Sequence, residues 1–201
     1  LTTKGTKDTK EEYHRNVVIG CDVAKHTDWT VLVAMDAETG RCFAMDRFNH
    51  LDWPIQKERI LAFSRKYRGR LILDASGVGD PIFDDLKRVY GDIEAFKFTS
   101  LSKTELVQRL IVAIEQRRIA WPSSWEILTA EMRRYEYQIG SSGGITYNAP
   151  AGYHDDCVMA LALANHRRWE TENAGRMLRL GCGGHHRAVG MRGNRERTLV
   201  G

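Results

Sequence analysis

Short apolar runs separated by turn residues dominate the first quarter of the chain. Residues 17–23 (VVIGCDV) form an almost continuous apolar run that includes Asp22, which is typical of a strand buried in the middle of a sheet. β-prone runs follow at 29–35 and 41–48, and the turn sequence DAETG at 36–40 joins them. Three consecutive strands with short connections predict an antiparallel meander.

Helical patterns alternate with short strands in the next part of the chain. Asp80-Pro81 is a strong helix start, with Asp80 as the N-cap and the proline at the first helical position. Ser102 and Glu105 have the spacing of a capping box at the start of a longer helix. The predicted elements of this part are strands at 71–74 and 93–98 and helices at 54–67, 80–90, 102–118 and 125–135.

A hairpin and a final helix are predicted after these elements. The glycine-rich sequence GSSGG at 140–144 lies between β-prone segments at 135–139 and 145–147, which predicts a projecting β-hairpin. Apolar residues with helical spacing predict the final helix at 155–169. From residue 175 onward the chain is rich in Gly and Arg without periodicity, which predicts a flexible tail.

The order of these elements predicts an α/β fold with a central mixed five-stranded sheet, helices on both faces and a β-hairpin. We expect three regions: a linker at 1–15, the folded domain at 16–170, and a flexible basic tail at 171–201. The first residue is Leu, and a polar segment precedes the first strand. We therefore expect a piece of a longer polypeptide whose N-terminal domain is absent.

The distribution of charge is more informative than the net charge of +4. Six Arg against two Glu give the 171–201 tail +4, and residues 1–15 have +1, so the predicted domain has about −1. The basic tails therefore do not by themselves indicate nucleic-acid binding. No apolar stretch approaches the roughly 18 residues of a membrane span. The four scattered cysteines form no C-x-x-C pair, which argues against a disulfide framework or a zinc site and favours a reducing cytoplasm.

Four aspartates stand where predicted strands end or a helix begins. Asp22 ends the first strand, Asp74 ends the fourth, and Asp155-Asp156 opens the last helix. Each has an ordinary alternative role, because strand-end aspartates often form turns and helix-start aspartates often cap helices. Neighbouring strands that end on one side of a sheet bring their last side chains together, and the last helix can direct its first turn to the same edge. The four carboxylates are therefore candidates for one site.

Carboxylates that meet at one edge repel each other unless cations neutralise them. Oxygen ligands without a nearby His or Cys set favour Mg²⁺ or Mn²⁺ over zinc. Two such ions suit phosphodiester hydrolysis, one activating a water and the other stabilising the departing 3′ oxygen. A central strand holds Asp22 most rigidly, so we expect it to bridge both ions. The sequence leaves open whether Asp155 or Asp156 contributes more, because Asp155 is on the sheet-facing side of the helix but is also the expected N-cap.

Four segments contain these aspartates and their surroundings: IGCDVAKHTDWTV (19–31), LILDASGVGDPIFDDL (71–86), SLSKTELVQRLIVAIEQRRIAWP (100–122) and ITYNAPAGYHDDCVMALALA (145–164). Together they resemble the C-terminal nuclease domain of the large terminase subunits of tailed bacteriophages. The resemblance implies an RNase H-like fold of the RuvC-like nuclease superfamily, and an Mg²⁺- or Mn²⁺-dependent endonuclease that cuts concatemeric double-stranded DNA. It implies that Asp22, Asp74 and the Asp155-Asp156 pair are the metal ligands.

The same resemblance implies partners and a cellular setting. An ATPase domain precedes the nuclease in this family, and the phosphate loop G-x-x-x-x-G-K-[ST] of such a domain does not occur in this chain. The portal and the small terminase subunit are further implied partners, in the cytoplasm of the host bacterium. No base-reading motif is present, so we expect phosphate-directed DNA binding without strong sequence preference.

Four polar residues near the aspartates are candidates for DNA contacts. Lys25 and His26 follow Asp22, Lys103 lies at a predicted helix start where backbone N–H groups also point outward, and His154 precedes the aspartate pair. Each could equally be a solvated surface residue. The hairpin is a candidate DNA guide or regulatory flap.

Three other functions fit parts of the pattern. A junction resolvase or an RNase H shares the chemistry and differs in its substrate. A sugar-kinase-like or Hsp70-like nucleotide-binding module also begins with an apolar strand that ends in Asp, but it needs glycine-rich phosphate loops and a second lobe for which this chain is too short. A catalytically silent module that holds DNA or docks on a portal is the third alternative.

Overall fold

The computed structural model of the protein describes residues 16–24, 28–77, 79–139, 145–150 and 152–181. Each predicted strand and helix is present, most with ends shifted by a few residues. The strands are β1 (Val17–Asp22), β2 (Thr30–Asp36), β3 (Cys42–Phe48), β4 (Arg70–Asp74), β5 (Ile93–Phe96), β6 (Glu136–Ile139) and β7 (Ile145–Asn148). The helices are α1 (Trp53–Tyr67), α2 (Gly79–Lys87), α3 (Ser100–Glu115), α4 (Glu126–Arg134) and α5 (Asp156–Gly181).

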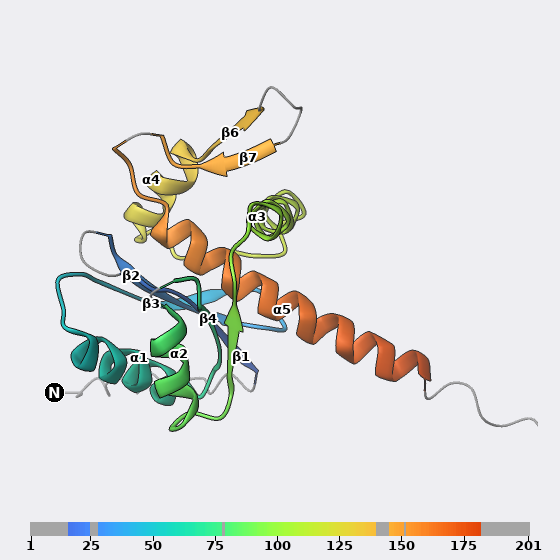
Figure 1. Cartoon of the computed structure of the whole chain (residues 1–201). Helices are drawn as coiled ribbons and strands as arrows, with labels where there is room; N and C mark the ends of the chain where they lie inside the picture. Colours follow the sequence, from blue (N-terminus) through green and yellow to red (C-terminus); the bar gives the residue numbers. More distant parts are fainter. Residues whose placement is uncertain (1–15, 25–27, 78, 140–144, 151, 182–201) are drawn as a thin grey trace, which may run out of the picture.

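The central sheet has five strands in the order β3-β2-β1-β4-β5. β1 pairs with β2 antiparallel and with β4 parallel, and β4 pairs with β5 parallel, so the sheet is mixed. β6 and β7 form a separate antiparallel hairpin, which Figure 1 shows projecting beside α4. The predicted α/β fold, with its five-stranded mixed sheet and hairpin, is confirmed.

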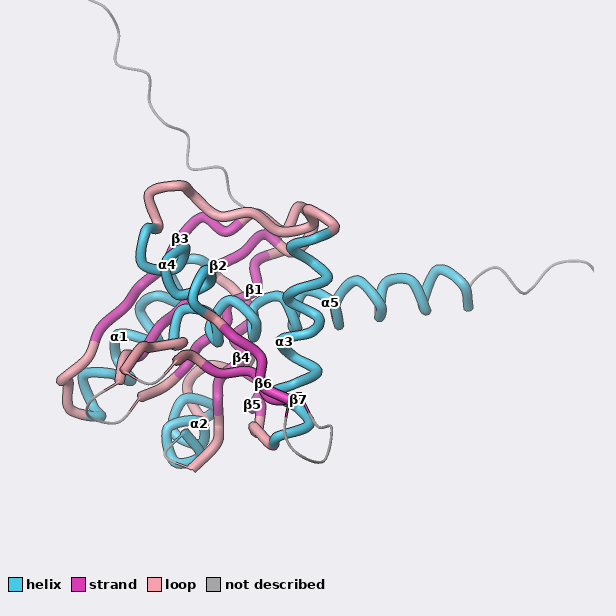
Figure 2. Tube along the Cα trace, turned by 90° about the horizontal axis from the view of Figure 1, so that it is seen from above, coloured by secondary structure: helices cyan, strands magenta, loops and turns pink. Residues whose placement is uncertain are grey.

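Helices cover both faces of the sheet, as the sequence predicted (Figures 1 and 2). The two faces follow from the alternation of side chains along each strand. Val18 points to a core shared with α3, α4 and α5, whereas Ile19 and Cys21 point to a core shared with α1 and α2. β1 is therefore buried on both faces, which explains its unbroken apolar run.

Helix α5 packs closely on β1 at Gly20. A Cβ atom at this position would lie 2.1 Å from the Ala160 carbonyl oxygen and 2.4 Å from the Ala164 nitrogen, both of them backbone atoms of the helix. The absence of a side chain at Gly20 and the small alanines facing it thus set the spacing between strand and helix. This contact fixes the first turn of α5 relative to the end of β1.

Two predicted helix caps differ from the structure. Helix α3 is capped by Thr99 and Ser102, which exchange backbone and side-chain hydrogen bonds, so the capping box lies one turn before the predicted Ser102–Glu105 box. Thr99 has the extended backbone that an N-cap needs (φ −123°, ψ 167°). Asp80 is inside the first turn of α2, not its N-cap, and its carboxylate pairs with Lys97.

The last helix is longer than predicted. It continues to Gly181, so residues 171–181 are helical and the predicted flexible tail does not begin at 171. Adding residues to an existing helix costs little, and most residues in this stretch favour helix even without an apolar stripe. Residues 1–15 and 182–201, which include the predicted linker and most of the predicted tail, lie outside the described residues. Among the described helices, none is both long enough and apolar enough to cross a bilayer.

Candidate metal centre

The carboxyl ends of β1 and β4 meet the start of α5 at one edge of the sheet. Asp22 and Asp74 are the last residues of their strands, and the parallel pairing of Cys21 with Leu73 brings these two ends side by side. Asp155 directly precedes α5 and Asp156 is its first residue. All four line one pocket of about 420 Å³, here called the acid pocket. Its lining residues are Asp22, Val23, Ala24, Asp28, Asp74, Phe98, Lys103, Asp155, Asp156 and Met159.

Hydrogen bonds hold three of the carboxylates in place. Asp74 accepts a bond of 2.8 Å from the Ser76 backbone N–H. Asp156 accepts a bond of 3.3 Å from the Trp29 backbone N–H. The carboxylate of Asp155 accepts a bond of 3.2 Å from the Lys103 ammonium group. The acid pocket is therefore built by β1, β4, the loop before β2, the start of α3 and the start of α5.

The carboxylates of the acid pocket are held in the repulsive arrangement that the sequence predicted. Burial raises the pKa of Asp22 well above its usual value, and the charges of Asp74 and Asp156 raise it further. Burial also raises the pKa of Asp74, although the Ser76 hydrogen bonds oppose it. The pKa of Asp156 is raised to about 6, mainly by burial. Five aspartates share the pocket with one lysine, so the protein alone leaves most of this negative charge unneutralised.

Both Asp155 and Asp156 line the acid pocket, and neither side chain is needed as the N-cap of α5. Glu131 accepts the free backbone N–H groups at the start of this helix instead. The Glu131 carboxylate accepts bonds of 2.8 Å and 3.4 Å from the backbone N–H groups of Cys157 and Val158. The Asp155 carbonyl accepts the Met159 N–H at 2.9 Å, while its side chain binds Lys103. The side chain of Asp156 is more enclosed than that of Asp155, 11% exposed against 26%.

The predicted DNA-contact residues fall into two groups. Lys103 lies in the acid pocket and also donates a bond of 3.1 Å to the Asn148 side chain of the hairpin. His154 lies at its rim, with Nδ1 3.5 Å from an Asp156 oxygen and 3.6 Å from an Asp28 oxygen. Lys25 and His26 lie outside the described residues.

Sequence reasoning missed three residues around the acid pocket. Asp28 follows Asp22 by only six residues, so its place in the loop after β1 was a usable signal. Glu131 and Tyr135 are far from the aspartates in sequence and gave no such signal. Tyr135 lies near Asp155 and Asp22, and burial together with their charges raises its pKa.

The donor set of the acid pocket fits hard divalent cations. Every acidic ligand it offers is a carboxylate oxygen, the donor that Mg²⁺ and Mn²⁺ prefer. Within the described residues, no three His, Cys, Asp or Glu side chains already converge on one ion position. Mg²⁺ does not require such a cage, because it keeps several waters and commonly takes one or two carboxylates together with substrate phosphates. The unneutralised charge supplies the attraction that such a site needs.

Comparison with known proteins adds an independent observation. The model of the terminase RNaseH-like domain family matches residues 19–168. The large terminase subunit of Thermus virus P23-45 is 32% identical over 170 residues, which cover 80% of this chain and 34% of that protein. The chain thus spans about a third of the length of this relative.

Solved structures of phage terminases share the fold. The large terminase nuclease of the thermophilic phage G20c with bound magnesium is similar with a TM-score of 0.68 at 30% identity, over 75% of this chain and 80% of that one. The large terminase nuclease domain of bacteriophage SPP1 with bound manganese is similar in fold, with a TM-score of 0.53 at 16% identity over 77% of this chain and 87% of that one. From the match of the family model over most of the folded region, the chain belongs to the terminase RNaseH-like domain family, the nuclease domain of large terminase subunits.

Proposed function

We propose that this domain is an Mg²⁺- or Mn²⁺-dependent endonuclease that cuts concatemeric double-stranded DNA during viral genome packaging. The observation that supports this most is the acid pocket, which Asp22, Asp74, Asp155 and Asp156 line together although they come from three separated parts of the chain. The nuclease of phage G20c, 30% identical, has been solved with bound magnesium. A fold alone does not imply an activity, so the proposal rests on this site.

The four aspartates would hold the metal, and we propose two ions. Asp22 is the proposed ligand shared by both, because the strand at the centre of the sheet fixes it between Asp74 on one side and the α5 pair on the other. When bound, such ions activate a water and stabilise the leaving 3′ oxygen of a phosphodiester. Glu131 orients the first turn of α5 and so sets the direction of Asp155 and Asp156.

Lys103 and His154 would both act on the substrate at the acid pocket. The Lys103 ammonium pairs with Asp155 at 3.2 Å and lies in the pocket, where it would contact a phosphate oxygen if Asp155 were engaged as a metal ligand. His154 lies against Asp156 and Asp28 at the rim, where its imidazole can donate to a phosphate oxygen. Lys25 and His26 are proposed to approach the DNA backbone from the loop after β1.

The wider setting of the reaction is also part of the proposal. The full protein would join this domain to an N-terminal ATPase domain and would meet the portal and the small terminase subunit in the host bacterial cytoplasm. DNA would be bound through its phosphates without strong sequence preference, with an affinity that falls as salt rises.

The test is cleavage of supercoiled plasmid by the 201-residue chain with Mn²⁺ or Mg²⁺. We expect nicked and linear products that disappear with EDTA. Asp22→Asn and Asp74→Asn should each lower the rate at least about a hundredfold, because even residues that only support metal ligands cost 10- to 100-fold when removed. Asp92→Asn is the matched control, since Asp92 is exposed and precedes β5 at the opposite edge of the sheet. Parent-like cleavage by both site variants, or no cleavage by the parent, would show a DNA-holding module instead.

A further inference from the structure

A second pocket of about 230 Å³ adjoins the acid pocket and has the opposite charge. It lies between β3, α4 and the segment before α5, and we call it the arginine pocket. Its lining residues are Arg47, Ile127, Ala130, Glu131, Arg134, Gly152, Tyr153 and His154. Of these residues, only His154 was predicted from the sequence as a candidate DNA contact, and the two arginines were missed because Arg47 and Arg134 are 87 positions apart.

One layer of side chains separates the two pockets. His154 lines the arginine pocket, and its Nδ1 atom is 3.5 Å from the Asp156 carboxylate of the acid pocket. On the other side, Trp29 donates its backbone N–H to Asp156 and offers its ring to Arg47. A ligand in the arginine pocket would therefore lie within a side chain's length of the proposed metal ligands.

Stacking orients both arginines and leaves their N–H groups available. The Arg47 guanidinium carbon lies 3.6 Å from the centroid of the Trp29 ring, and that of Arg134 lies 4.8 Å from the Tyr153 ring. Stacking of this kind fixes a guanidinium plane, whose N–H edges then match the oxygens of a phosphate. The buried Arg47 Nε atom has no hydrogen-bond partner. Within the described residues, neither arginine forms an ion pair with a carboxylate.

The one acidic residue of the arginine pocket is engaged elsewhere. Glu131 accepts the backbone N–H groups of Cys157 and Val158 at the start of α5. Burial raises the pKa of Glu131 and the charge of Arg47 opposes this rise, so this carboxylate offsets part of the positive charge, and the two arginines still leave the pocket with an excess of it. An anion in this pocket would be attracted by both guanidinium groups.

We propose that the arginine pocket binds one backbone phosphate of the DNA strand, next to the phosphate that is cut at the acid pocket. This rests on the proposed function, because it assumes that the acid pocket holds the scissile phosphate. Successive phosphates of a strand pass such a site at a short, regular spacing, and a contact to the second one fixes the position of the first. The arginine pocket thereby sets the register and direction of the strand without reading its bases.

The test compares Arg134→Gln with Arg133→Gln, which removes the same charge from the neighbouring, exposed position of α4 outside the pocket. Binding of a fluorescent 30-base-pair duplex is measured by anisotropy in Ca²⁺ over a range of salt concentrations. We expect Arg134→Gln to weaken binding about three- to tenfold and to lower the slope of log affinity against log salt by about one. In plasmid cleavage it should raise KM and also lower kcat, because the contact both binds the strand and positions the phosphate that is cut.

Arg47→Lys gives an independent readout that keeps the positive charge. It loses the planar fork that stacks on Trp29, so we expect weaker binding with an unchanged salt slope. Mn²⁺ affinity and Tm, measured on every variant, show that the acid pocket and the fold are intact. Equal salt slopes and equal KM values for Arg134→Gln and Arg133→Gln would contradict phosphate binding in the arginine pocket. A parent protein that binds DNA but does not cut it would instead contradict the proposed function. The anisotropy comparison would still show whether the arginine pocket binds a phosphate.

Discussion

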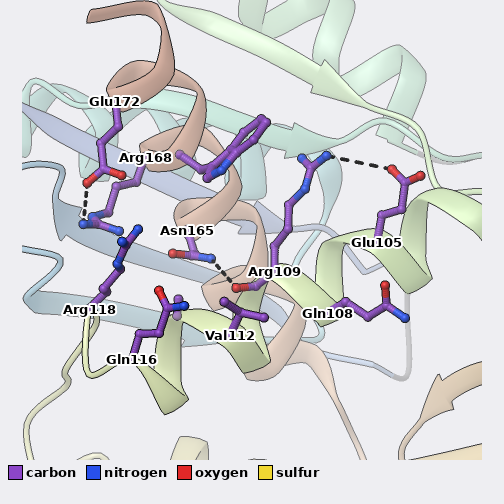
Figure 3. Close-up of a pocket in the computed structure, with 11 residues that line it drawn as sticks. Glu105, Gln108, Arg109, Val112, Gln116, Arg118, Asn165, Arg168 and Glu172 are labelled. Carbon is purple, nitrogen blue, oxygen red and sulfur yellow. Dashed lines mark hydrogen bonds and ion pairs between the residues drawn. The ribbon is translucent and has the colours of Figure 1, made fainter. Parts of the chain in front are cut away.

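The acid pocket and the groove between α3 and α5 are both lined with charged side chains, but the groove pairs most of its charges with opposite ones. The groove has a volume of about 270 Å³, and Figure 3 shows two of its three arginines, Arg109 and Arg168, each directed at a glutamate. Arg168 donates a bond of 2.6 Å to Glu172, and Arg109 lies 3.9 Å from Glu105. The acid pocket instead gathers five aspartates around Lys103.

This difference separates charges that support the fold from charges kept for a ligand. In the groove, each charge of a pair offsets the desolvation cost of its partner. Removing one partner leaves the other uncompensated and should lower the free energy of unfolding. Like charges held together raise the free energy of the folded state, so removing one of them should make the protein more stable. The sign of the stability change therefore distinguishes the two regions, and the following predictions use it.

The largest expected effect is in the groove. Glu172→Gln leaves the Arg168 guanidinium, whose side chain is only 7% exposed, without its carboxylate partner. We expect the free energy of unfolding to fall by about 2 kcal/mol, below the usual cost of breaking a fully buried pair because Glu172 is 35% exposed. Urea denaturation measures this. A urea midpoint equal to that of the parent would contradict a stabilising role for the paired charges of the groove.

The next largest effect is a pH dependence of the stability of the metal-free protein. The folded-state pKa of Asp156 is raised to about 6, so between about pH 4 and pH 6 the folded state holds a proton that the unfolded chain releases. The contribution of Asp156 to stability therefore falls as pH rises through this window. From pH 5 to pH 7.5 the loss is about 1 kcal/mol, or about 3 °C in Tm. Thermal melts in EDTA check it, and saturating Mn²⁺ should reduce the pH dependence.

A change of comparable or smaller size is expected when one aspartate of the acid pocket is neutralised. Asp22→Asn removes the carboxylate whose pKa is raised by burial and by its acidic neighbours. At pH 7.5 in EDTA we expect Tm to rise by about 3 °C, the shift that roughly 1 kcal/mol produces in a domain of this size. Asp92→Asn should leave Tm within about 1 °C of the parent. A lower Tm for Asp22→Asn would mean that Asp22 stabilises the fold.

The smallest effect is at the exposed end of the groove. Glu105 is 54% exposed and lies 3.9 Å from Arg109, so the pair is screened by solvent. Glu105→Gln should change the free energy of unfolding by less than about 0.5 kcal/mol in the same urea experiment. A loss equal to that of Glu172→Gln would show that exposure does not govern these pairs.

Much of the fold was predictable because it depends on local patterns. The unbroken apolar run of β1 reflects a strand covered on both faces, and the acids at the ends of β1 and β4 follow from parallel pairing. Boundaries were less certain where two signals overlapped. Thr99 and Ser102 both have capping spacing in the sequence, and only the backbone at Thr99 decides between them. The length of α5 was missed because its last turns have no apolar stripe.

The layer around the acid pocket could not be predicted, because long-range packing builds it. Glu131 on α4 caps α5, and Arg47 on β3 stacks on Trp29 of the loop before β2. Neither contact joins residues at a characteristic spacing in the sequence, so no sequence motif indicates it. The proposed metal ligands stand at the ends of regular elements and can be found there from the sequence, whereas the residues that orient them come from any part of the chain that packs nearby.

The most direct test of the acid pocket is a calorimetric titration of the metal-free protein with Mn²⁺ at pH 7.5. We predict saturable binding of two ions by the parent and by Asp92→Asn, and loss of most of this binding in Asp22→Asn. Binding that is absent from the parent, or that is the same in Asp22→Asn as in the parent, would contradict the assignment of these aspartates as metal ligands.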